Sequence, residues 1–145
     1  TALPEDTPSG LQVEIIAEFM VGEAEKFGLK VAKGKAEETV VGYNAKTEEL
    51  YVDRSESGET AFDNGFSGVH TAPLQPDNGR IKIHIFLDHS SVEIFGNDGE
   101  VVITDRIFPS PESKAITLFT KGGPTKVNSL DIWKLNSIWG KLKNN

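Results

Sequence analysis

The sequence predicts an all-β protein in which two antiparallel sheets pack face to face, a β-sandwich of the jelly-roll or concanavalin-like kind with about nine or ten strands. Three observations lead to this fold class. Short segments of alternating apolar and polar residues recur along the chain. Glycine, proline and asparagine separate these segments at turns. No long segment carries the consistent apolar stripe of a helix.

The clearest strand pattern lies in residues 79–108. Apolar residues at every second position of 81–87 predict a strand with one buried face. A Gly-Asn-Asp-Gly turn at 96–99 separates two further β-rich segments, 91–95 and 100–107. Three consecutive strands joined by tight turns predict an antiparallel meander, and this is the best-defined core in the sequence.

Other strands are predicted by the same alternation and by β-branched residues. They cover residues 11–21, 27–33, 38–43, 50–52, 116–120 and 127–135. The segment 59–78 holds two glycines, two prolines and an Asn-Gly turn, so we expect it to cross the surface as a loop. Short helices over 24–33 and 137–143 are an alternative, although neither segment has a consistent apolar face.

The length of 145 residues fits one domain that can bury a sizeable core. We expect residues 1–10 to form a linker or extended lead-in, 11–139 the sandwich, and 140–145 a disordered tail. The single methionine, Met20, lies inside the first predicted strand. The chain therefore reads as a piece of a longer polypeptide.

Composition argues against several classes of partner. The net charge of −7 and the absence of a basic cluster disfavour nucleic acid. No apolar run approaches the roughly 18 residues of a membrane span. With no cysteine and only three dispersed histidines, we expect no metal site and no cofactor. The lack of cysteine suits an exported bacterial protein and a cytosolic one equally.

Four segments, taken together and in this order, resemble the C-terminal β-sandwich of glycoside hydrolase family 32. They are Leu-Tyr-Val-Asp-Arg-Ser-Glu-Ser-Gly at 50–58, His-Thr-Ala-Pro-Leu at 70–74, Phe-Leu-Asp-His-Ser-Ser-Val-Glu-Ile-Phe-Gly-Asn at 86–97 and Thr-Asp-Arg-Ile-Phe-Pro at 104–109. The family contains the β-fructosidases: levanase, inulinase and invertase. The resemblance covers nearly the whole chain from about residue 11 onward.

The resemblance implies that the catalytic machinery lies elsewhere. Enzymes of this family carry a carboxylate nucleophile and an acid on an N-terminal five-bladed propeller, in motifs with Asp-Pro pairs and a Glu-Cys pair that are absent here. Retaining hydrolysis needs two carboxyl groups about 5 Å apart, and nothing in this sequence identifies such a pair. We therefore expect no catalytic residues, and an inactive module that stabilises or orients a catalytic propeller in a secreted bacterial parent. A cytosolic location stays open.

The alternative function is binding of fructose units in levan or inulin, with Tyr51, Asp53, Arg54 and Glu93 as candidate contacts. Aspartate and arginine match vicinal sugar hydroxyls, but they also form structural bridges. Asp53 precedes turn residues and could instead bind loop amides. For these residues the structural interpretation is favoured.

Strand parity gives expectations for the other candidates. Tyr51 has the opposite parity from Leu50 and Val52, so of the aromatic residues that could stack on a sugar we expect it to be the most exposed. Glu93 should face outward if its neighbours face the core, where it binds a sugar or pairs with a cross-strand arginine or lysine. The other aromatic residues that could stack on a sugar are Tyr43, Trp133 and Trp139. An exposed Trp133 suits an interdomain contact.

Overall fold

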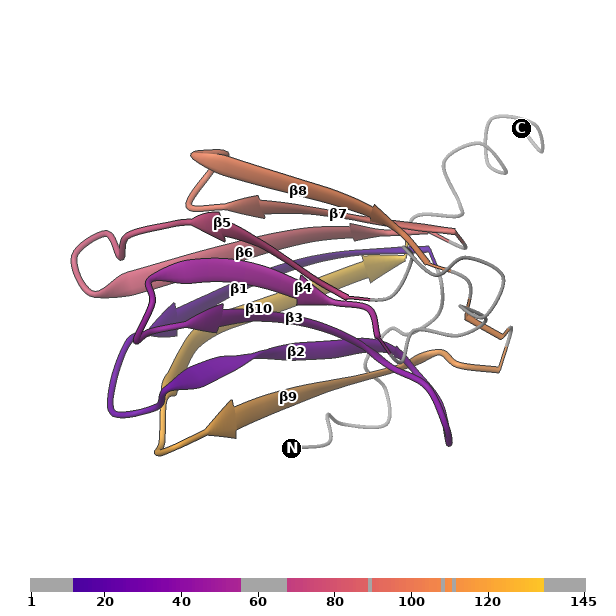
Figure 1. The fold of residues 1–145 in the computed structure, drawn as a ribbon, viewed down its shortest axis with the longest axis horizontal. Coiled ribbons are helices and arrows are strands. Elements are labelled where there is room, and N and C mark those ends of the chain that lie inside the picture. The colour runs from indigo at the N-terminus through magenta and orange to yellow at the C-terminus, as the bar shows by residue number, and fades with distance from the viewer. Residues whose placement is uncertain (1–11, 56–67, 89, 108, 111, 135–145) are drawn as a thin grey trace.

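The structure, a computed structural model, describes residues 12–55, 68–88, 90–107, 109–110 and 112–134. Within these ranges the chain forms ten strands and no helix, so no helix there could cross a membrane (Figure 1). The strands are β1 (Val13–Met20), β2 (Lys26–Lys33), β3 (Thr39–Asn44), β4 (Glu49–Asp53), β5 (Val69–Pro73), β6 (Arg80–Leu87), β7 (Ser91–Gly96), β8 (Val101–Arg106), β9 (Ala115–Lys121) and β10 (Lys126–Lys134).

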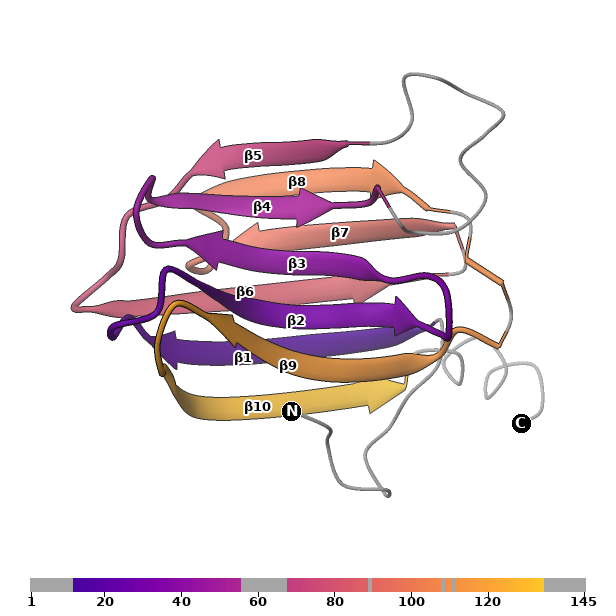
Figure 2. The same ribbon diagram turned by 60° about the horizontal axis from the view of Figure 1, so that its bottom comes forward.

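The strands form two five-stranded antiparallel sheets that lie face to face (Figures 1 and 2). The first, here called the β1 sheet, has the order β10-β1-β6-β7-β8, and the second, the β3 sheet, has the order β5-β4-β3-β2-β9. The predicted two-sheet sandwich is confirmed. The predicted meander is also confirmed as β6, β7 and β8, because these strands are neighbours in one sheet.

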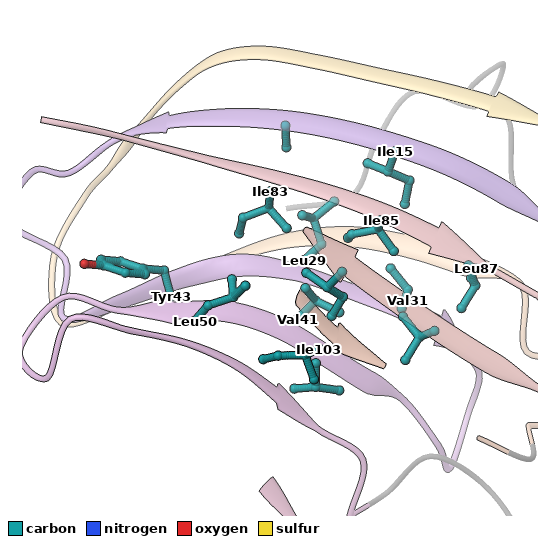
Figure 3. Close-up of a cluster of buried hydrophobic side chains, with 14 of the residues drawn as sticks. Ile15, Leu29, Val31, Val41, Tyr43, Leu50, Ile83, Ile85, Leu87 and Ile103 are labelled. Atoms are coloured by element: carbon teal, nitrogen blue, oxygen red, sulfur yellow. The ribbon is translucent and has the colours of Figure 1, made fainter. Parts of the chain in front are cut away.

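The core lies between the inner faces of the two sheets. Alternate residues of β1 and β6 are buried, as the period of two requires. The β1 sheet contributes Ile15 and Ile85, which are directly paired, and the β3 sheet contributes Leu29 and Val41, which are also paired (Figure 3). All four side chains are inaccessible to solvent. Burial of these aliphatic side chains is the main stabilising contribution to the fold.

One strand lies where a loop was predicted. β5 falls within 59–78, the segment expected to cross the surface, and it pairs with β4 at the edge of the β3 sheet. The prediction was wrong because β5 is mostly exposed and so lacks the apolar alternation of a half-buried strand. Its Pro73 is tolerated at an edge, where a missing backbone donor interrupts no second ladder.

The other predictions concern the two alternative helices and the ends of the chain. The alternative helix over 24–33 is wrong, because this segment contains β2. The expected lead-in at 1–10, the tail at 140–145 and the alternative helix at 137–143 lie outside the described residues.

A carboxylate joins two connections at one end of the sandwich. Glu37, in the turn between β2 and β3, accepts hydrogen bonds from the backbone and hydroxyl of Ser110 and from the hydroxyl of Ser113, at 2.7 Å for the Ser110 backbone and 2.5 Å for Ser113. The two serines belong to the connection from β8 to β9, which crosses between the sheets. Partial burial by itself would raise the pKa of Glu37, but the serine hydrogen bonds outweigh it and the pKa is lowered.

Replacing Glu37 by glutamine should lower the free energy of unfolding by about 1 kcal/mol at pH 7. The pKa of Glu37 is lower in the folded protein than in the unfolded chain. The carboxylate therefore stabilises the fold above the pKa of the unfolded chain, and this stabilisation is lost as the pH falls through the pKa of the folded protein. The difference between wild type and E37Q should therefore shrink below about pH 4. Urea unfolding at pH 7 and pH 3 measures this, with the exposed Glu112→Gln as control. An equal difference at both pH values would contradict the assignment.

Candidate functional site

The four candidate sugar-binding residues lie on different sheets. Tyr51 and Asp53 belong to β4, and Arg54 follows that strand, all in the β3 sheet. Glu93 belongs to β7 in the β1 sheet. The structure therefore brings Tyr51, Asp53 and Arg54 near one another and does not bring Glu93 to them.

Tyr51 lies on the outer face of the β3 sheet but is not exposed. It pairs with Gly42, and the space where a Cβ atom of Gly42 would lie is within 2.7 Å of the tip of the tyrosine ring. The ammonium group of Lys26 lies 5.7 Å from the ring centroid, and only 9% of Tyr51 remains accessible. Its predicted parity is confirmed and its predicted exposure is wrong, because the ring lies down over a glycine. Tyr51 thus fills the sheet surface and offers no open platform for a sugar ring.

The two tyrosines share a raised pKa for related reasons. Burial, followed by the negative charge of Asp53, raises the pKa of Tyr51 to about 12. Burial, followed by Glu48, raises the pKa of Tyr43 to about 12. The hydroxyl of Tyr43 donates to the carbonyl of Leu74 at 2.7 Å inside the core. Tyr43 is therefore a core residue. Trp139, another aromatic candidate, lies outside the described residues.

Replacing Gly42 by alanine should displace the Tyr51 ring and lower stability by about 1–2 kcal/mol. The added methyl group would meet the ring, which can rotate into solvent. The pKa of Tyr51 should then fall from about 12 towards an ordinary value near 10, while Tyr43 is unchanged. Because the chain has two tyrosines, an ultraviolet phenolate titration resolves the change, and Tyr51→Phe identifies the group. Two unshifted tyrosines in G42A would show that the ring does not depend on Gly42.

Asp53 ends β4 and organises the turn after it. Its Oδ1 atom accepts hydrogen bonds from the backbone N–H of Ser55 at 3.0 Å and from the Ser55 hydroxyl at 2.7 Å. This geometry matches the interpretation of Asp53 as a residue that binds loop amides.

Polar contacts join the two sheets where β5 and β8 meet. His70 Nδ1 lies 2.5 Å from Asp105 Oδ1, and Asp105 is buried whereas the His70 side chain is half exposed. Nη1 of Arg54 donates to the carbonyl of Arg106 at 2.9 Å. His70 was not predicted as part of a site, because its partner Asp105 lies on a strand of the other sheet. These contacts give Arg54 a structural role at this edge.

The outer face of the β1 sheet carries a second group that sequence reasoning did not assemble. Strand register places Phe86 beside Glu93, and His84 beside Phe95. Glu14, on β1, is paired with Phe86 on β6 at one side and with Trp133 on β10 at the other. We call this set the aromatic face. Its members are Glu14, His84, Phe86, Glu93, Phe95 and Trp133.

The prediction that Glu93 faces outward is confirmed. Val92 and Ile94 are buried in the core, so the carboxylate lies on the opposite face of β7. Trp133 is 45% exposed on the same face, as expected for it.

A polar hollow of about 150 Å³ lies at the hairpin end of the same sheet. Two of its charged side chains form an ion pair: Lys82 Nζ lies 2.8 Å from Asp98 Oδ1, and this hydrogen bond raises the pKa of Lys82. Oδ1 of Asn97 accepts a hydrogen bond from the backbone N–H of Lys82, and its Nδ2 donates one to the carbonyl of Gln75. Among the described residues no group of three or more acids or histidines has the arrangement of a metal site. These contacts of Lys82 and Asn97 hold the hairpin that borders the hollow.

Comparisons with known proteins agree with the fold. The model of the family described as glycosyl hydrolases family 32 C terminal matches residues 1–134. A levanase of Bacillus subtilis (strain 168) is 50% identical over 135 residues, which span 91% of this chain and 20% of the levanase. An extracellular exo-inulinase of Aspergillus awamori is 40% identical over 112 residues, 77% of this chain and 21% of that enzyme.

Solved structures give the same result. The crystal structure of exo-inulinase from Aspergillus awamori matches with a TM-score of 0.85 at 36% identity, covering 89% of this chain and 26% of that chain. Sucrose-6-phosphate hydrolase from Lactobacillus gasseri matches with a TM-score of 0.71 at 29% identity, covering 92% of this chain and 26% of that chain. The chain belongs to glycosyl hydrolase family 32 and corresponds to its C-terminal β-sandwich module. It spans about a fifth of the length of the levanase and the exo-inulinase.

Proposed function

We propose that this chain is the non-catalytic C-terminal module of a secreted β-fructosidase, and that it stabilises the catalytic domain of the same polypeptide by packing against it. One observation carries the proposal. The chain matches the model of the C-terminal part of the family, and the segment it matches is only 20% of the length of a levanase. Most of such an enzyme therefore lies outside the sandwich. The substrate of the parent is a β-fructoside, of the kind named by the levanase and exo-inulinase relatives.

The arrangement of carboxylates supports a non-catalytic role. Hydrolysis with retention uses an acid and a nucleophile about 5 Å apart across a sugar-sized cleft. The described acids that make close contacts use them structurally: Asp53 holds a turn, Asp105 bonds His70, and Glu37 joins two connections. The catalytic pair of the parent would then reside in the preceding domain.

Secretion of the parent is part of the proposal. It is supported by the Aspergillus relative, which is named an extracellular exo-inulinase.

Deleting this module from the parent enzyme tests the proposed function. We expect the truncated enzyme to lose activity faster on heating than the full-length enzyme, while its initial activity on fructan is retained in part. The measurement is the half-life of fructan hydrolysis at several temperatures. Equal half-lives with and without the module would contradict a stabilising role.

A second candidate function is binding of fructan by the module. One observation favours it: Arg54 and the half-exposed His70 lie at the same edge as Asp53, and such groups hydrogen-bond to sugar hydroxyls. Glu93, on the other sheet, would contribute a separate contact. Calorimetric titration of the module with fructan oligosaccharides tests this, with Glu93→Gln and Arg54→Gln as variants. Absence of heat at millimolar ligand would leave only the packing role.

A further inference from the structure

The outer faces of the two sheets differ in composition. On the outer face of the β3 sheet, the ammonium group of Lys26 lies over the flattened ring of Tyr51. Lys30 and Lys121 lie on the same face, together with one further aromatic residue, Phe119. On the β1 sheet, the central strands β6 and β7 instead present the aromatic face defined above. Aromatic residues are depleted on ordinary surfaces relative to interfaces, so this face has the composition of a protein contact.

The rings of the aromatic face are already ordered by contact with one another. The centroid of His84 lies 4.7 Å from that of Phe86, and the rings of Phe86 and Phe95 meet edge to face at 5.9 Å and 86°. Nε2 of His84 lies 2.6 Å from Oε2 of Glu14, which holds the imidazole in place. Side chains that are ordered before binding lose little conformational entropy when a partner covers them.

Glu93 adds a charge to this apolar surface. Strand register places it between Phe86 on β6 and Thr104 on β8. In the described parts of the chain no lysine, arginine or histidine forms an ion pair with Glu93, whereas Asp98 on the following turn is paired with Lys82. A partner that covers this face should therefore carry apolar side chains together with an arginine or lysine opposite Glu93.

The geometry of the rings favours a protein partner over a sugar. A sugar ring stacks on the open face of an aromatic ring. Here Phe86 and Phe95 are nearly perpendicular, and His84 is tilted by 34° to one and 52° to the other. The three rings offer no common plane, and they are only partly exposed.

We propose that the aromatic face is the surface on which the module packs against the catalytic domain that precedes it in the same polypeptide, an inference that rests on the proposed function. About four fifths of the levanase lies outside the segment that this chain matches, and the match is to a C-terminal model. The chain enters the sandwich at β1, in the same sheet, and Glu14, its second residue, lies between Phe86 and Trp133. The start of β1 is thus part of the aromatic face.

The test uses the full-length parent enzyme with Phe86 and Phe95 both replaced by threonine, a β-forming residue that keeps the strands. The matched control replaces Val40 and Phe119 by threonine on the outer face of the β3 sheet. We expect F86T/F95T to shorten the thermal half-life of activity by about tenfold, towards that of the truncated enzyme, because aromatic anchors dominate interface energies. Limited proteolysis should also cleave between the domains faster. The control should match wild type in both measurements.

A second variant and the isolated module separate the outcomes. Glu93→Lys should loosen the domains in the same way, and circular dichroism of the isolated module should show that both variants remain folded. If truncation shortens the half-life but neither variant does, the aromatic face is not the contact and the stabilising role survives. If truncation itself has no effect, the proposed function fails. If the isolated module binds fructan oligosaccharides and F86T/F95T abolishes that binding without loosening the domains, the face is a sugar site and the inference is overturned.

Discussion

Replacing Gly28 by alanine should lower the free energy of unfolding by about 3 kcal/mol or more, which removes much of the stability of a small domain. A Cβ atom at this position would lie 2.2 Å from the carbonyl oxygen of Val41 and 2.6 Å from the Cα atom of Gly42. Both atoms belong to the backbone of the adjacent strand β3, so the contact cannot be relieved by moving a side chain. Urea denaturation followed by circular dichroism measures the loss.

Gly99 supplies the matched control for this prediction. It also has a positive φ, of 96°, but a Cβ atom there meets nothing within 4 Å. Gly99→Ala should therefore cost only the backbone strain, about 1 kcal/mol. If the two alanine variants were equally stable, the close approach of β2 and β3 at Gly28 would not be what requires a glycine.

Ile85→Ala should be the most costly truncation in the hydrophobic core among those considered, at about 2–5 kcal/mol. Ile85 is completely buried and lies between Ile15 on β1 and Ile94 on β7, in the middle of the β1 sheet. Removing its side chain leaves a cavity that two β-strands cannot close without breaking their ladders. The measurement is again the urea midpoint and slope of the isolated module.

Two comparisons define the contribution of burial. Ile85→Val should cost about 1 kcal/mol, since only one methyl group is lost. Val102→Ala, at a half-exposed position of β8, should change stability by less than about 0.5 kcal/mol. A loss at Ile85 no larger than the loss at Val102 would mean that the inner faces of the sheets are not packed together.

Local pattern was sufficient to predict the strands that alternate strongly. The period of two in 81–87 places Ile85 in the core and Phe86 outside, and the structure agrees. The same pattern failed for β5, because an exposed edge strand carries no apolar period. Periodicity therefore detects half-buried strands and overlooks edges.

Register and neighbouring strands could not be predicted from local pattern. β1 lies between β10 and β6, and Glu14 meets Trp133 only through that pairing of distant segments. His70 and Asp105 likewise meet across the two sheets. Tyr51 was assigned to the correct face, but its burial depends on the absence of a side chain at Gly42 on the next strand. The aromatic face was missed for the same reason, since it is assembled from four strands.

The most direct test of a non-catalytic module is an assay of fructan hydrolysis by the isolated chain. The purified chain, shown to be folded by circular dichroism, would be incubated with sucrose, inulin and levan, and the released fructose measured. We expect no release above that of buffer, whereas the full-length parent hydrolyses its substrate under the same conditions. Fructose release that is proportional to the concentration of the isolated chain would contradict the account.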